Sequence, residues 1–548
     1  MHSTMPRAGE TGLEQSNTGG SDGLFRTSTT YRTASEFSSM VLSYGHQTYD
    51  SFRPNSGSRK NYANFEGQFH AGPKQTLSTY FAYANSYEQL SGEIDSTDFY
   101  ARHAIDNPVY AANRSFIKIE SNRIGITDDY AFADRIANKA TFFVTTQTFQ
   151  QPFAHGFSDA NRFNYGVRNT ASYGTRAGAV DLNGVLGGQF QRTNYTNNGY
   201  TIPASSPTDQ ENYAFNYYGF TEWTATAPSQ VSFTLGGAVN ANEFGIRNLL
   251  VNKIVATPEA AVHRRAFPAV FTPRASLLKT FSDQVSVYGS ASTGYTPPSL
   301  TTIIASDNSI NWNLKPEKAV QYELGSKGHV LNRKLSFDLA LFDLEVSDKL
   351  VSQKVGTVSF TTNAGKQRNQ GAELTVSALV IDDPSRPVSL LRPWFSCTYS
   401  NFKYVDFKSD NNNNAATVSY DGKQVARTPK NMLNIGLDAA SRSGLYLYGS
   451  YQYVDKAFVT FTNSNWVKSY SLLNAKLGWQ RKLDRHWDLD VSAGGDNLLG
   501  STYYTFLFVG PTYAGLAQAK DGGTGDGYII PGDYNASFFG GARLSYGF

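Results

Sequence analysis

The sequence predicts one large all-β fold, an antiparallel transmembrane β-barrel of the 22-strand type. Three observations lead to this fold class: segments in which apolar and polar residues alternate, joins that alternate between short and long, and many aromatic residues without a long apolar run. The 548 residues include 34 Tyr, 36 Phe and 6 Trp, while only 17% of the residues are charged. No linker divides the chain, and no apolar run reaches the roughly 18 residues that a transmembrane helix needs.

The last predicted strand shows the alternation clearly. One face carries Phe538, Gly540, Ala542, Leu544, Tyr546 and Phe548, and the other carries Phe539, Gly541, Arg543, Ser545 and Gly547. A period of two with one apolar face is typical of a strand that has lipid or a core on one side only. Acidic side chains are unfavourable against lipid, so Asp338, Asp488 and Asp490, which alternate with apolar residues, are expected to face the lumen.

The same pattern predicts about 21 strands along the chain. They lie near residues 24–33, 38–49, 60–71, 75–88, 116–124, 137–150, 162–174, 178–194, 211–225, 230–245, 266–281, 284–297, 318–331, 334–349, 360–380, 390–407, 431–441, 444–459, 470–483, 487–499 and 536–548. Tight joins such as Ser282-Asp283 and Asn332-Arg333 alternate with long ones such as 89–115 and 500–535. Short turns belong at the periplasmic rim and long loops outside. Residues 125–136 and 381–389 are long for members of the short class.

Counting these joins backwards places residues 11–23 in the first external loop. A strand should precede that loop, but the ten residues before it contain Pro6 and Gly9 and do not form one. We therefore expect the first strand to be missing, residues 1–23 to be an N-terminal extension left from that loop, and residues 24–548 to be the barrel. The N-terminus also has no apolar core after Arg7, so we expect a secretory signal to have been lost upstream.

Composition argues against several other classes of protein. A net charge of +3, spread thinly, gives no basis for nucleic-acid binding, and the single Cys397 excludes an internal disulfide and a cysteine-based metal cluster. The eight histidines show no paired metal-ligand spacing, so we expect no enzyme, no metal site and no cofactor. A calcium site in the segment Asp521 to Gly527 and a large soluble β-protein, such as a propeller or adhesin, stay open as alternatives.

Several motifs occur in the order and spacing of a known family. They are Asn313-Leu314-Lys315-Pro316-Glu317-Lys318, Tyr322-Glu323-Leu324-Gly325, Asn363-Ala364-Gly365, Gly371-Ala372-Glu373-Leu374 and a terminal Phe548. This set resembles the signature of TonB-dependent outer-membrane receptors over roughly residues 24–548. The motif residues are expected to be structural, because Pro316 suits a loop that re-enters a strand and Gly325 and Gly371 permit close packing. A role for Glu323 and Glu373 in holding a plug is the alternative.

The resemblance implies a receptor barrel that imports a scarce, bulky ligand across the outer membrane, most often a ferric siderophore. A passive porin-like barrel, or uptake of cobalamin or an oligosaccharide, stays open. Nothing in the sequence resembles the family's plug domain or its TonB-contacting segment, so the chain is expected to be a plug-less fragment that reaches TonB only through the missing plug. The expected surroundings are outer-membrane lipid, and the expected state is a monomer.

Anionic iron chelates favour arginine, lysine and aromatic contacts. Such residues occur in two segments at the long joins, and the candidate ligand-binding residues are Tyr49, Arg53, Arg59, Lys60, Arg102 and His103. The alternative for each of them is a solvated loop side chain.

Overall fold

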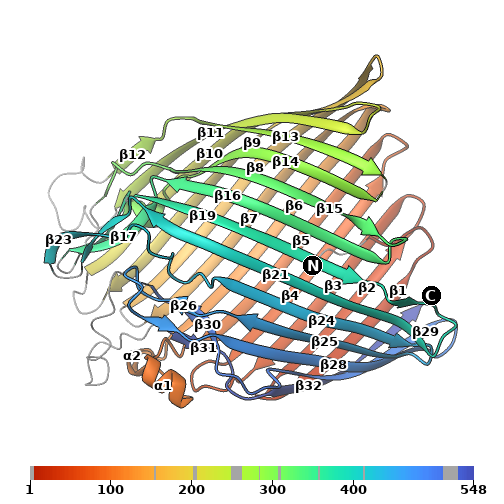
Figure 1. Cartoon of the computed structure of the whole chain (residues 1–548). Coiled ribbons are helices and arrows are strands. Elements are labelled where there is room, and N and C mark those ends of the chain that lie inside the picture. The colour runs from red at the N-terminus through yellow and green to blue at the C-terminus, as the bar shows by residue number, and fades with distance from the viewer. Residues whose placement is uncertain are drawn as a thin grey trace.

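A computed structural model shows the chain as a closed antiparallel β-barrel (Figure 1). The structure describes residues 5–153, 156–201, 206–248, 262–282, 284–305, 310–355, 358–363, 365–411, 414–509 and 529–548. Among these residues the main sheet has 24 strands, of which β12 and β20 are short pieces that pair with one neighbour each. The other 22 form the ring.

The ring consists of long strands in sequence order. They are β1 (Gly12–Gly20), β2 (Phe25–Ala34), β3 (Ser38–Tyr49), β4 (Ser58–His70), β5 (Gln75–Gln89), β6 (Phe116–Ala133), β7 (Ile136–Phe153), β8 (Gly156–Ala177), β9 (Val180–Thr201), β10 (Ser206–Thr226), β11 (Val231–Asn248), β13 (Val270–Ser282), β14 (Val285–Thr296), β15 (Glu317–Val330), β16 (Leu335–Ser347), β19 (Lys366–Ala378), β21 (Val388–Val405), β24 (Asn431–Ser441), β25 (Leu445–Val454), β28 (Tyr470–Lys482), β29 (Trp487–Asp496) and β32 (Ser537–Gly547). β12 (Val262–Ala266) and β20 (Ile381–Asp382) extend the pairing of β11 and β21.

Each of the 21 predicted strands has a counterpart in the ring, and β3 and β24 have the predicted bounds. The predicted strand 360–380 is divided, because residues 358–363 form a separate strand outside the ring and β19 begins at Lys366. The two joins that looked too long for the short class also have an explanation. β6 continues to Ala133, so that only residues 134–135 form the turn, and β20 occupies part of residues 381–389. In the first place the strand runs further than its apolar alternation does, and in the second a separate two-residue strand pairs with β21.

The expectation that the first strand is missing is wrong. Residues 12–20, which we assigned to an external loop, form β1, which pairs with β2 on one side and with β32 on the other. The outward positions of β1 include Gln15 and Asn17 instead of apolar residues, so the usual pattern is absent. These amides share hydrogen bonds with the hydroxyl of Thr27, with Gln15 Nε2 2.9 Å from its oxygen. Satisfied by one another, the polar groups tolerate an outward position.

Exposure identifies the two faces of the wall. On β15, Tyr322 and Leu324 are 61% and 56% exposed and point outward, so Glu323 between them points into the lumen. On β29 the exposed Val491 points outward and Asp490 inward, where it accepts a hydrogen bond from Tyr446. By the same alternation Asp338 and Asp488 also face the lumen, as expected.

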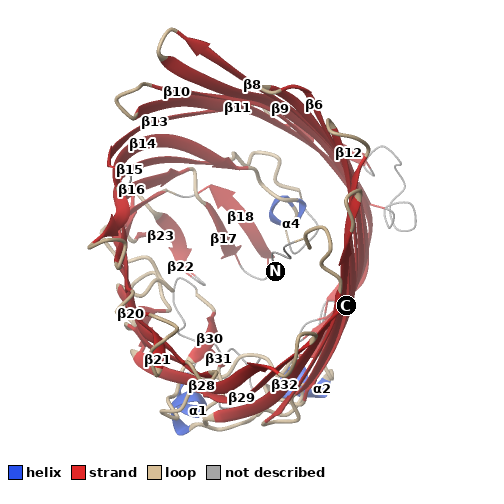
Figure 2. Cartoon of the chain, turned by 90° about the vertical axis from the view of Figure 1, so that its right-hand side faces the viewer, coloured by secondary structure: helices blue, strands red, loops and turns tan. Residues whose placement is uncertain are grey.

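The joins divide into two ends. Seen along the barrel, several hairpins of the long joins lie inside the ring of strands (Figure 2). They are β17 (Leu350–Val355) with β18 (Val358–Asn363), β22 (Lys408–Asn411) with β23 (Asn414–Ser419), and β30 (Tyr504–Leu507) with β31 (Ile529–Pro531). The long joins also form the hairpin β26 (Ala457–Phe458) with β27 (Trp466–Val467) and the helices α1 (Ser96–Ala101), α2 (Pro108–Ala112) and α4 (Leu300–Ile303). We call this the long-loop end and the opposite one the short-turn end. None of the described helices has the length and apolar character needed to cross a membrane.

Candidate functional site: the long-loop end

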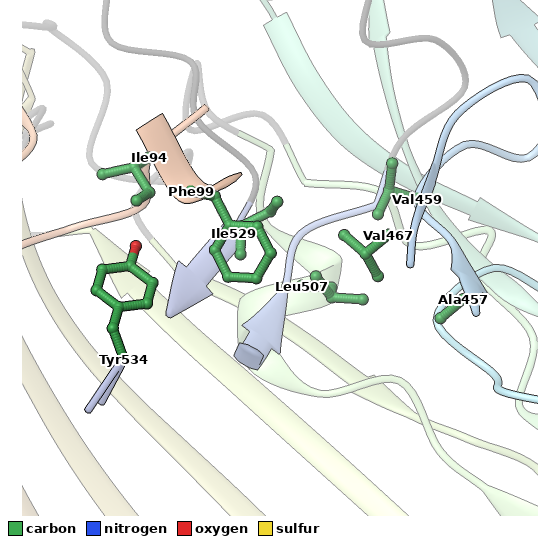
Figure 3. Packing of buried hydrophobic residues seen from close by; sticks show 8 residues of the cluster. All are labelled: Ile94, Phe99, Ala457, Val459, Val467, Leu507, Ile529 and Tyr534. Carbon is green, nitrogen blue, oxygen red and sulfur yellow. The ribbon is translucent and has the colours of Figure 1, made fainter. Parts of the chain in front are cut away.

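Three long joins pack into one buried cluster, which we call the rim core (Figure 3). Its members are Ile94, Phe99, Ala457, Val459, Val467, Leu507, Ile529 and Tyr534. They come from the joins β5–β6, β25–β28 and β29–β32, and a backbone bond from Ile94 N to Ile529 O, 2.9 Å long, connects the first with the last. These joins are therefore folded against one another, and the rim core can hold a binding surface in a fixed shape.

Arg53 belongs to this folded layer. Its side chain is only 5% exposed, and its Nε and Nη2 donate to Ile105 O at 2.9 and 2.8 Å. Nη2 also donates to Gly92 O at 2.9 Å. Burial lowers the pKa of the guanidinium, while the nearby Tyr534 and Asp106 act in the opposite direction. Arg53 therefore connects the join after β3 with the join after β5 through hydrogen bonds.

Arg102 and His103 lie at the end of α1. Arg102 has a positive φ of 60°, as a residue that ends a helix often does, and its guanidinium lies 5.8 Å from the centre of the Tyr534 ring. It donates to the backbone oxygens of Gly500, at 3.1 Å, and of Tyr534. His103 Nδ1 lies 2.9 Å from a carboxylate oxygen of Asp98. Both residues have partners within the protein.

The other three candidates lie on strand ends. Because Leu42 of β3 points outward, Tyr49 on the same strand points inward. Lys60 also points inward, with its Nζ 2.7 Å from Glu88 Oε1, and Arg59 points outward. The six candidate residues therefore do not form one cluster.

The motif residues make structural contacts. Leu314 is 1% exposed, and the backbone of Lys315 is held on both sides by Asn363, whose Oδ1 accepts from Lys315 N at 2.7 Å and whose Nδ2 donates to Lys315 O at 2.9 Å. Glu317 Oε1 accepts from Leu350 N at 2.7 Å. Together these bonds connect the join before β15 with the hairpin β17–β18.

Two motif glycines lie under aromatic rings on the inward face. A Cβ on Gly325 would overlap the ring of Tyr288, and one on Gly371 would overlap the ring of Phe342. The Tyr288 hydroxyl donates to Glu323 Oε1 at 2.7 Å, which gives this carboxylate a partner in the wall itself. Three motif residues remain. Gly365 has a positive φ of 69°, and Glu373 points inward. Phe548 points outward and is 67% exposed.

The reasoning from sequence missed the cation–aromatic groups of the long joins, among which are two with an exposed ring. Lys456 Nζ lies 5.4 and 5.2 Å from the ring centres of Phe458 and Trp466 on the hairpin β26–β27. Arg427 lies 4.7 Å from the ring centre of Phe506 on β30. Trp466 and Phe506 are 49% and 41% exposed. The spacing Lys456-Ala457-Phe458 could have indicated the first group, whereas no local pattern connects Arg427 with Phe506.

No three His, Cys, Asp or Glu side chains within the described part of the chain are placed to hold a metal ion. The segment Asp521 to Gly527, considered above for calcium, lies outside the described residues.

Comparison with known proteins agrees with this architecture. The family described as "TonB dependent receptor-like, beta-barrel" matches residues 43–498. The "Ferrioxamine receptor" of Yersinia enterocolitica is 26% identical over 204 residues, which cover 37% of this chain and 25% of that protein. The "Ferric-pyoverdine M114 receptor PbuA" of Pseudomonas sp. (strain M114) is 26% identical over 247 residues, 43% of this chain and 27% of that protein. The chain thus aligns with about a quarter of each relative's length.

Solved structures match over almost the whole chain. The siderophore receptor PiuA from Acinetobacter baumannii superposes with a TM-score of 0.79 at 15% identity, covering 99% of this chain and 82% of that one. The ferric citrate transporter FecA in the unliganded form gives 0.79 at 13% identity, covering 99% and 79%. At identities of 13–15% the superpositions show a shared fold only. The family match rests on the sequence itself and covers most of it, residues 43–498. The chain therefore belongs to the TonB-dependent receptor-like β-barrel family, a family of the outer membrane.

Proposed function

We propose that the chain is the barrel of an outer-membrane receptor that imports a ferric siderophore with energy supplied through TonB. The observation that carries the proposal is the closed 22-strand ring with folded joins packed over one end. Two relatives in its family are named as receptors for ferrioxamine and ferric pyoverdine, which supports this class of ligand.

The two cation–aromatic groups provide the binding chemistry in this proposal. Arg427 and Lys456 bring positive charge to anionic iron chelates, and the exposed rings of Phe506 and Trp466 offer flat apolar contacts. The rim core lies directly beneath, since Ala457, Val467 and Leu507 are members of it. A surface held in this way loses little conformational freedom when a ligand binds.

A binding experiment tests the ligand class. The purified chain is titrated with ferrioxamine, ferric pyoverdine and a ferric catecholate while tryptophan fluorescence is followed. We expect one class to bind saturably, and Arg427→Ala or Lys456→Ala to weaken it about tenfold, equivalent to about 1.4 kcal/mol. Lys327→Ala, which removes a lysine from the lumen wall near the short-turn end, is the matched control. Failure of all three chelates to bind would contradict the siderophore assignment.

An uptake experiment tests the use of TonB. In this proposal a plug and a TonB-contacting segment act together with the barrel, so the gene is expressed with its neighbouring DNA in cells that lack their own siderophore receptors. Iron uptake should depend on TonB. Uptake that persists without TonB would indicate a passive barrel instead.

A further inference from the structure

The wall of the barrel is split between two neighbouring strands at the long-loop end. β13 and β14 pair from the short-turn end up to Arg274 and Ser292, and the pairing stops there. Beyond this point β13 pairs only with β11, and β14 only with β15. Pro273 has no amide hydrogen to offer β14, and the Thr293 hydroxyl bonds its carbonyl at 3.1 Å instead.

A cavity of about 600 Å³ occupies this split, and we call it the β13–β14 slot. Its walls include Phe267, Phe271, Leu314 and Val320. Phe267 and Leu314 are buried members of a second apolar cluster and close the inner side of the slot. Phe271 is 63% exposed on the outward face, so the slot opens toward the surroundings of the barrel.

Three cations line the slot, namely Arg265, Lys315 and Lys318. No ion pair joins any of them to a carboxylate of the described residues, although the Arg265 guanidinium lies 4.8 Å from the centre of the Phe267 ring. Asp348 is the acidic residue of the lining. The backbone of Lys315 is fixed by Asn363, as described above. The rim of an apolar cavity thus carries an excess of positive charge on a well-held segment.

The height of the slot places these charges at the edge of the membrane. β13 has an exposed Phe281 near the short-turn end and the exposed Phe271 beside the slot, ten residues apart. With a rise of about 3.3 Å per residue and a tilt of about 40°, the distance between them along the barrel axis is about 25 Å. This equals the usual height of the apolar band, so the slot lies where the band meets the lipid headgroups.

We propose that the β13–β14 slot binds a phosphorylated lipid of the outer leaflet. An acyl chain would lie against Phe271 and Val320 with Leu314 at the base, and the phosphate would contact Lys315 and Lys318. Apolar walls account for the chain, and unpaired cations at headgroup height account for the phosphate. The site is distinct from the proposed siderophore surface, because it lies on the outer face of other strands.

Native mass spectrometry of the full chain in a neutral detergent tests this proposal. Three probes are compared: bisphosphorylated lipid A, an uncharged diacylglycerol with similar chains, and inorganic phosphate. We expect one lipid A molecule to remain bound, and the other two probes to bind at least tenfold more weakly. Equal binding of inorganic phosphate would show a free-anion site, and equal binding of diacylglycerol would show a merely apolar groove; either result overturns the proposal.

Variants locate the site. Lys315→Ala/Lys318→Ala should weaken lipid A binding at least tenfold, and so should Lys318→Glu alone, which leaves the segment held by Asn363 intact. Lys327→Ala, on the same strand but inward and near the short-turn end, should bind like the parent protein. Heat-dependent migration in SDS gels confirms that each variant is folded. Unchanged binding in the folded double variant would refute the assignment to this slot.

Discussion

Arg53 connects two of the folded joins through its buried guanidinium. Its guanidinium donates to carbonyl groups of Ile105 and Gly92, and its burial means that truncation would leave these acceptors without a donor. Hydrogen bonds to a charged group contribute about 1.5–3 kcal/mol each. We predict that Arg53→Ala exposes the joins to limited proteolysis while the barrel keeps its heat-dependent migration. Arg59→Ala, an outward arginine nearby, is the control, and equal resistance of both variants would contradict this role.

Asp22 should make the stability of the β1–β2 join and of the neighbouring residues before β32 depend on pH. Burial, followed by the charge of Asp533 and a hydrogen bond to it, raises the pKa of Asp22 above its ordinary 3.8. A carboxyl that holds its proton more tightly when folded stabilises the folded form below the ordinary pKa, and this stability is lost as pH rises through the raised value. Hydrogen exchange in residues 21–24 and 529–536, corrected for intrinsic rates, should therefore increase as the pH rises above 3.8 and through the raised pKa.

Asp533→Asn should reduce this pH dependence, because it removes the neighbouring charge. Asp383→Asn, in a join at the opposite end of the barrel, should leave it unchanged. An increase in exchange that is the same in the Asp533→Asn variant would assign the pH dependence to other groups.

Gly325 is a position where the wall has no room for a side chain. Because the Tyr288 ring occupies the place of a Cβ, Gly325→Ala should displace the ring and its bond to Glu323, lowering the free energy of unfolding by about 1–3 kcal/mol. Urea unfolding in detergent measures this change. Gly449→Ala, where a Cβ would meet open space, should cost much less. A similar loss of unfolding free energy in both variants would mean that the effect of alanine on strand propensity, and not the overlap with the Tyr288 ring, causes the destabilisation.

The candidate binding residues show what sequence reasoning could not supply at this scale. Arg53 was selected as a charge in a long join, yet its partners are carbonyls some forty and fifty positions further along the chain, which no local pattern reveals. Arg427 and Phe506 meet for the same reason only in the folded joins. The glycine and glutamate residues of the strand motifs, in contrast, could be assigned to the inward face of the barrel from the alternation of apolar and polar residues alone.

Strands were predictable to the extent that their outward face is apolar. β3 and β24 meet that condition and were found with their bounds, whereas β1 carries Gln15 and Asn17 outward and was mistaken for a loop. Short hairpins such as β26–β27 were missed because two-residue strands have no period to detect. What determines these elements is hydrogen bonding to neighbours distant in sequence.

β1 should be essential for a stable barrel. Deleting residues 12–20 would leave β2 and β32 each with an unpaired edge, and unpaired backbone groups are costly in lipid. We predict that the deletion abolishes heat-dependent migration in SDS gels. Gln15→Ala/Asn17→Ala keeps the backbone pairing and should preserve it. A deletion variant that still migrates as a compact barrel would show that β2 and β32 can close the ring directly.

At the level of the whole molecule, the number of strands followed from parity. Alternating joins required an even ring, and the ring of 22 was predicted even though its first member was placed upstream instead of at residues 12–20. The strand number can be predicted correctly even when one strand is not recognised. Long loops and short turns must alternate between the two ends, so an odd count shows that one strand is missing from it. The packing of the long joins had no comparable rule and had to come from the structure.

The pairing of β1 with β32 also has a consequence for how the molecule folds. Gly12 is the partner of Gly547, so the contact that closes the ring joins segments from opposite ends of the sequence. Contacts of such high sequence separation form slowly, since a long stretch of chain must lose conformational entropy before the contact forms and contributes favourable free energy. Until both segments have met, two strand edges stay open to pairing with other chains. Closure should be the slow, aggregation-prone step of assembly, and it can begin only after β32 has been synthesised.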